Sequence, residues 1–97
     1  MATYVQLINF TEQGVKNIKE SPARAAAFRK QVEGAGGKVR EIYWTLGKYD
    51  GVLIFDAPDD ETAAALMLTL AGKGNVKTHT LRAFDEKEFS AVLKKVK

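Results

Sequence analysis

A phenol and a carboxylate stand side by side near the middle of the chain, at Tyr49 and Asp50, with Gly47 and Gly51 close on either side. Glycine lets the backbone adopt positive φ angles there. A tyrosine and an aspartate held in this way could bind a ligand or transfer a proton. The competing interpretation is structural, because Asp-Gly is a common turn sequence and the tyrosine could pack on a neighbouring segment or subunit.

Other side chains with chemical potential are spread along the predicted strands. Asp56 ends an apolar strand, where it could face a cavity with a raised pKa, cap the next helix or pair with Arg82. Trp44 could stack on a planar ligand, or anchor a core or an interface. His79 is the only histidine and cysteine is absent, so the sequence offers no set of metal ligands and predicts no cofactor. We expect His79 to lie on the surface or on an edge strand.

The composition is that of an ordinary globular protein. With 97 residues, 45% of them hydrophobic, we expect one domain over residues 1–97 with a core of its own. The net charge of +3 is not clustered into a patch, so nucleic-acid binding is not predicted. No apolar run approaches the roughly 20 residues needed to cross a bilayer, and the N-terminus lacks a signal-peptide pattern. We therefore expect a cytoplasmic protein with no membrane partner.

Hydrophobic periodicity predicts the order strand, helix, strand, strand, helix, strand, followed by a C-terminal helix. The predicted strands cover residues 3–10, 38–45, 52–57 and 75–84, and the predicted helices cover 12–19, 21–34, 59–71 and 85–96. Thr11, Ser21, Asp59 and Asp85 are the expected N-caps. This order predicts an α+β, ferredoxin-like β-α-β-β-α-β sandwich with a core at residues 3–84, in which two helices cover one face of an antiparallel four-stranded sheet.

The predicted helix at 59–71 is apolar nearly all round. One stripe suffices to cover a sheet, and the helix also carries Ala64, Leu68 and Ala71 outside that stripe. The second cover is expected to be another subunit or the C-terminal segment of the same chain.

Strand alternation predicts which side chains face the helices and which face away. The uniformly apolar set is expected on the helix side: Val5, Leu7, Leu53, Phe55 and Ala57. The mixed set is expected on the open side: Tyr4, Gln6, Ile8, Val52, Ile54 and Asp56. A mixed open face could pair with a second sheet around a small cavity, which is what a small-molecule site needs. The candidate ligand-binding residues are Tyr4, Gln6, Trp44, Tyr49, Asp50, Asp56 and Arg82.

The segment Gly47-Lys48-Tyr49-Asp50, with Tyr43-Trp44-Thr45 before it and Ala57-Pro58-Asp59-Asp60 after it, resembles the GYD-domain family of small bacterial and archaeal proteins. That family is named for a Gly-x-Tyr-Asp loop, here Gly47, Tyr49 and Asp50. Supporting similarities are Gly14-Val15-Lys16-Asn17-Ile18, Ser21-Pro22-x-Arg24, Gly36-Gly37 and Gly74-Asn75-Val76-x-Thr78. The resemblance implies a ferredoxin-like domain of the dimeric α/β-barrel group. It implies no established activity, and the C-terminal helix lies outside its core pattern.

These observations predict a small homo-oligomer, at least a dimer, that binds a small molecule in a barrel cavity or serves as an assembly module. The alternative is a cofactor-free monooxygenase or isomerase, because the dimeric α/β-barrel group includes such enzymes. RNA recognition is a further alternative, since RNA-binding modules share this topology. However, residues 52–56 lack the basic, glycine- and aromatic-rich signature of those modules.

Overall fold

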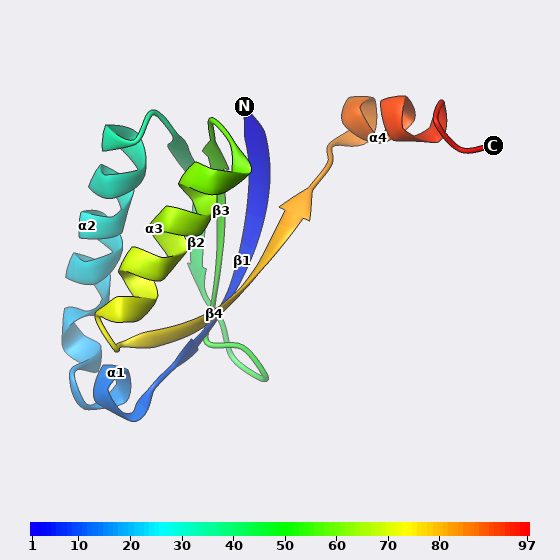
Figure 1. Ribbon diagram of the computed structural model, residues 1–97. Helices are drawn as coiled ribbons and strands as arrows, with labels where there is room; N and C mark the ends of the chain where they lie inside the picture. Colours follow the sequence, from blue (N-terminus) through cyan, green and yellow to red (C-terminus); the bar gives the residue numbers. More distant parts are fainter.

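The computed structural model describes residues 1–97 and contains one antiparallel sheet with strand order β2-β3-β1-β4. Its strands are β1 (Ala2–Phe10), β2 (Lys38–Trp44), β3 (Gly51–Ala57) and β4 (Val76–Ala83). Its helices are α1 (Glu12–Lys16), α2 (Ser21–Gly34), α3 (Asp60–Gly72) and α4 (Glu86–Leu93), with a short 3-10 turn, η1 (Ile18–Glu20), before α2. The helices α2 and α3 lie side by side on one face of the sheet (Figure 1). The predicted α+β, ferredoxin-like arrangement is therefore confirmed.

Three of the four expected helix caps are present. The Thr11 hydroxyl accepts a hydrogen bond from the Gly14 amide at 3.1 Å, and the Asp59 carboxylate accepts one from the Thr62 amide at 2.8 Å. Asp85 and Glu88 form a complete capping box at the start of α4. The fourth prediction, that Ser21 caps α2, was wrong.

Ser21 does not cap α2 but is its first residue. Its hydroxyl instead accepts a hydrogen bond from the Trp44 indole at 3.0 Å. Because the 3-10 turn η1 leads directly into α2, the backbone at Ser21 is already helical and cannot take the extended conformation of an N-cap.

The core lies between the sheet and the two covering helices. Phe55 is fully buried at its centre, with the Tyr4 ring stacked at 5.3 Å and the Phe28 ring edge-on at 6.2 Å between centroids. Helix α2 contributes Phe28 and Val32, and α3 contributes Ala63 and Leu66. These residues are the helix stripes that the 3.6-residue period predicts.

The predicted orientation of β1 was wrong, whereas that of β3 is confirmed. Residues directly opposite in neighbouring strands share a face, and Tyr4 lies opposite Phe55 while Gln6 lies opposite Leu53. Tyr4, Gln6 and Ile8 therefore face the helices, and Val5 and Leu7 face away. The side chains on either side of β1 are apolar enough to be buried. The orientation is therefore decided by the pairing with β3 and not by the polarity of β1 itself.

The outer side of α3 stays uncovered. Leu68 is 73% exposed, and Ala64 and Ala71 are exposed beside it. The C-terminal segment does not fold back over them, because α4 stands apart from the body at the end of β4 (Figure 1). No helix of the structure is both long enough and apolar enough to cross a membrane.

Candidate functional site

The face of the sheet opposite the helices has an apolar centre with polar side chains around it. We call it the open face, and its floor consists of Val5, Leu7, Val52, Ile54 and Leu81. The first four side chains are partly exposed, and Leu81 is 52% exposed. The face is mixed, as expected, since Glu41, Asp56 and His79 share it, but the corrected orientation of β1 puts Val5 and Leu7 here in place of Tyr4 and Gln6. A contiguous apolar surface of this kind usually marks a contact site.

One end of the open face is closed by Asp56, as predicted for a carboxylate at the end of this strand. Its oxygens accept hydrogen bonds from the Thr3 hydroxyl at 2.6 Å and from Arg40 Nε at 2.7 Å. Burial works to raise the pKa of Asp56, but the hydrogen bonds from Thr3 and Arg40 outweigh it and hold the pKa below its ordinary value. Asp56 is therefore ionised at neutral pH and paired on both oxygens, which rules out the raised pKa that was one of the alternatives for this residue.

The partner of Asp56 is Arg40, whereas the sequence suggested Arg82 or a capping role. Arg40 lies at an irregularity in the pairing of β2 with β3, between Val39 and Glu41. A β-bulge of this kind redirects side chains without leaving a clear sequence signal. Arg40 was missed for that reason.

The other end of the open face holds Tyr49 and His79. The two rings meet edge to face, with centroids 6.3 Å apart, and the Lys48 ammonium lies 5.7 Å from the centre of the Tyr49 ring. His79 is exposed on the edge strand β4, as expected, and lies opposite Leu7. Sequence reasoning missed the pairing of Tyr49 with His79, because only the register of β4 against β1 brings them together.

The Gly-x-Tyr-Asp loop is fastened to the end of β1. The Asp50 carboxylate accepts a hydrogen bond from the Phe10 amide at 2.8 Å, and the Asp50 amide donates to the Ile8 carbonyl at 2.8 Å. Within the loop, the Thr45 hydroxyl donates to the Tyr49 carbonyl at 2.6 Å. These bonds favour the structural interpretation of Asp50.

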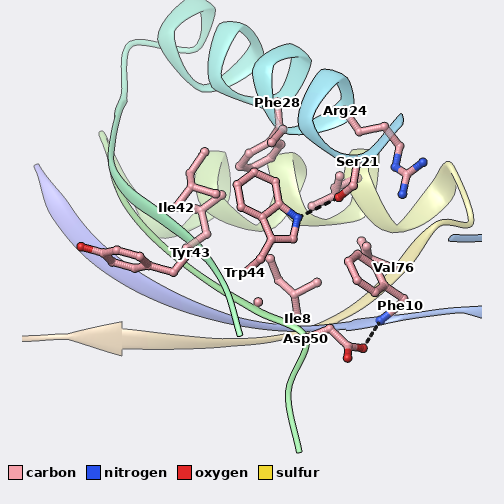
Figure 2. Close-up of a pocket in the computed structure, with 14 residues that line it drawn as sticks. Ile8, Phe10, Ser21, Arg24, Phe28, Ile42, Tyr43, Trp44, Asp50 and Val76 are labelled. Carbon is pink, nitrogen blue, oxygen red and sulfur yellow. Dashed lines mark hydrogen bonds between the residues drawn. The ribbon is translucent and has the colours of Figure 1, made fainter. Parts of the chain in front are cut away.

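Behind this loop, between α2 and the sheet, lies a small apolar pocket. Figure 2 shows Trp44 and Asp50 in its wall, the first hydrogen-bonded to Ser21 and the second to Phe10, while Tyr43 points away. The pocket measures about 70 Å³, far below the roughly 300–1,000 Å³ of small-molecule sites. Trp44 thus anchors β2 against α2, which is the structural alternative considered for it.

Tyr4 and Arg82 lie in a shallow groove of about 500 Å³ between α3 and β4. The Tyr4 hydroxyl donates a hydrogen bond to the Asp60 carboxylate, and the Arg82 guanidinium lies 5.9 Å from the Tyr4 ring centre. Burial, followed by the bond to Asp60, raises the pKa of Tyr4 to about 12. The phenol is therefore protonated at neutral pH.

Gln6 is completely buried, and neither its side-chain oxygen nor its side-chain nitrogen has a hydrogen-bond partner. An unpaired amide in the core costs about 1–3 kcal/mol, so this side chain is a local weakness of the helix-covered face.

The seven candidate residues therefore do not form one site. Tyr49 and Asp56 lie at opposite ends of the open face, and Trp44 and Asp50 line the small pocket. Tyr4 and Arg82 share the α3–β4 groove, and Gln6 lies alone in the core.

Comparisons with known proteins agree with this fold. The model of the GYD domain matches residues 4–93, so the match includes all of α4, which was expected to lie outside the pattern. The glutamine synthetase and cystathionine beta-lyase binding protein of Thermus thermophilus is 36% identical over 95 residues, which cover 97% of this chain and 100% of that protein.

Two solved structures share the fold. The crystal structure of TTHA0845 from Thermus thermophilus has a TM-score of 0.56 and 24% identity, covering 87% of this chain and 94% of that one. The crystal structure of MtbAldR has a TM-score of 0.59 and 15% identity, covering 88% of this chain. This chain spans only 52% of MtbAldR.

The family model and the full-length relative both cover the Gly-x-Tyr-Asp loop and the sheet around it. The chain belongs to the GYD-domain family.

Proposed function

We propose that this protein is a small homo-oligomeric binding protein, which pairs with itself through the open face and associates with metabolic enzymes. The observation that supports this proposal most strongly is the relative that is 36% identical over its full length and is named for binding glutamine synthetase and cystathionine beta-lyase. Those two enzymes are the candidate partners of this chain.

The open face supports self-association. Antiparallel sheets with one covered face usually present polar side chains on the other, and here the floor is Val5, Leu7, Val52, Ile54 and Leu81. Two such faces, packed about 10 Å apart, would bury both floors, as in the dimeric α/β-barrel that the sequence resemblance implies.

The polar groups favour binding over catalysis. Asp56 is ionised and engaged by Thr3 and Arg40, and Asp50 is engaged by the Phe10 amide. A general acid or base needs a free path to substrate, which the hydrogen bonds to both carboxylates obstruct, and the pKa of Asp56 is lowered away from neutral pH.

The test is a binding measurement with purified glutamine synthetase and cystathionine beta-lyase from the organism that encodes this chain. Each enzyme is immobilised and titrated with the untagged protein, and an unrelated oligomeric enzyme serves as the control surface. We expect saturable binding to at least one of the two enzymes and none to the control. The absence of saturable binding to both enzymes at micromolar concentrations would contradict the proposed partners.

A further inference from the structure

We propose that α4 is an arm that docks into the groove between α3 and β4 of a second copy of this chain. The surface involved is the outer side of α3, on the opposite side of the sheet from the open face. This contact therefore goes beyond the self-pairing proposed above.

Helix α4 has an apolar stripe and nothing to pack on within its own chain. Phe89 is 51% exposed, Leu93 is 53% exposed, and Val96, just after the helix, is 68% exposed. The helix has only eight residues, and isolated helices shorter than about 12 residues are marginal in water. A partner surface is needed to stabilise it.

The groove has the shape and the side chains to receive a helix. One wall is α3, with the exposed Leu68 and the small Ala64, and the other is the β4 edge, with Thr78 and Thr80. Small residues let two helices approach closely, and the roughly 500 Å³ of the groove can accept several apolar side chains.

Charge complementarity selects this groove for α4. Helix α3 begins with Asp59, Asp60 and Glu61 and is followed by Lys73. Helix α4 has the same order, with Asp85, Glu86 and Glu88 at its start and Lys94, Lys95 and Lys97 after it. An antiparallel arrangement therefore places the lysines of α4 beside the acidic start of α3, and the two helix dipoles also oppose each other favourably.

The same charges argue against docking on the groove of the same chain. Asp56 and Ala83 both lie opposite Thr3, so α3 begins and β4 ends at the same end of the sheet, taken along the strand direction. Only Phe84 and Asp85 link β4 to α4. Folding back over this short link would lay α4 parallel to α3, with the two acidic starts together.

The contacts at the link hold α4 outward. The Arg82 guanidinium lies 4.6 Å from the centre of the Phe84 ring and pairs with the Glu88 carboxylate at 3.5 Å.

The absence of cysteine allows a direct cross-linking test on the full-length chain. Leu68→Cys on α3 and Val92→Cys, at an exposed apolar position of α4, are made in separate proteins. One protein is labelled with ¹⁵N, and the mixture is treated with a short bismaleimide. We expect a cross-linked dimer whose mass is one labelled chain plus one unlabelled chain. Ala26→Cys, on the exposed side of α2, replaces Leu68→Cys in the control and is expected to give several-fold less of this product.

The double variant, with both cysteines in one chain, distinguishes the two docking modes. Cross-linking inside one chain, with no mixed dimer, would show that α4 folds onto its own groove and would overturn the proposal. A mixed dimer no more abundant than in the Ala26→Cys control would also overturn it. Reversing the charge of Lys94 and Lys95 to glutamate is expected to lower the mixed dimer several-fold, and reversing Lys30 on α2 is not. Neither negative result bears on enzyme binding or on pairing through the open face.

Discussion

The two faces of the sheet differ in what covers them, although both have apolar side chains at their centre. On one face Phe55, Leu53 and Val39 are at most 4% exposed under α2 and α3. On the other, Leu81 is 52% exposed and the side chains of Val5 and Ile54 are only partly covered.

Within one chain, the helices cover only one of the two faces of the sheet. Burying apolar surface contributes roughly 25 cal/mol per Å², so an uncovered apolar face is a strong driving force for association. The helix-covered face gives the protomer its stability, and the open face is the surface that the proposed function assigns to a second sheet.

The largest expected effect is a difference in the free energy of unfolding between variants at two adjacent residues of β3, which point to opposite faces. Phe55→Ala should lower the free energy of unfolding by about 3–5 kcal/mol, because it empties the centre of the core. Ile54→Ala should lower it by no more than about 1.5 kcal/mol in the isolated protomer, because that side chain is already partly exposed. Chemical denaturation at low protein concentration measures both values.

The same pair tests which face mediates assembly. Stability that depends on association rises with protein concentration. Ile54→Ala should weaken that dependence, whereas Phe55→Ala should lower stability at every concentration. Equal losses for both variants in the isolated protomer would contradict the distinction between the two faces.

Tyr4, on the helix-covered face, should cease to stabilise the fold at alkaline pH. Burial and the bond to Asp60 raise the pKa of Tyr4 to about 12 from an unfolded value of about 10. The stabilisation is therefore fully present below about pH 10 and is lost as the pH rises toward 12. Tyr4→Phe should unfold with a shallower dependence on pH across that range, as measured by denaturation at several pH values. An unchanged dependence would show that Tyr4 titrates normally.

Asp56, at one end of the open face, should cease to stabilise the fold at acidic pH. The pKa of Asp56 is lowered in the folded chain, with burial opposed by the bonds from Thr3 and Arg40. Its contribution is therefore present above the unfolded pKa of about 3.9 and is lost as the pH falls through the folded value. Asp56→Asn should be less stable than the parent at neutral pH, and the difference should shrink below about pH 4. A constant difference between the two proteins over this range would contradict the assignment.

The smallest expected effect concerns Gln6, in the middle of the covered face. Gln6→Met keeps the length of the side chain and removes a buried amide that has no partner. We expect a gain of up to about 1 kcal/mol in the free energy of unfolding. A loss of more than about 1 kcal/mol would show that the amide is hydrogen-bonded in solution.

Element order and type could be predicted from the sequence because local signals, such as helix caps and strand alternation, mark the elements. The caps at Thr11, Asp59 and Asp85 and the alternation along β3 predicted what the structure contains. Local chemistry decides these features.

The orientation of β1 could not be read locally. Side chains on both sides of this strand are apolar, Tyr4 and Ile8 on one side and Val5 and Leu7 on the other. Gln6 lies on the side that the helices cover, and its amide makes that side resemble a solvent-exposed one. The partner of Asp56 depends on an irregularity in strand pairing, and the pair of Tyr49 with His79 depends on the register of β4. Long-range pairing sets these features, so the candidate site was predicted less well than the fold.

The most direct test of the account is the native mass of the parent protein and of Leu81→Glu, measured side by side at micromolar concentration. Leu81 lies on the open face and is half exposed in the protomer, so the substitution should leave the fold intact. We expect a homo-oligomer for the parent and for the control Ala26→Glu, and a lower subunit number for Leu81→Glu. A monomeric parent, or an unchanged mass for Leu81→Glu, would contradict pairing through the open face.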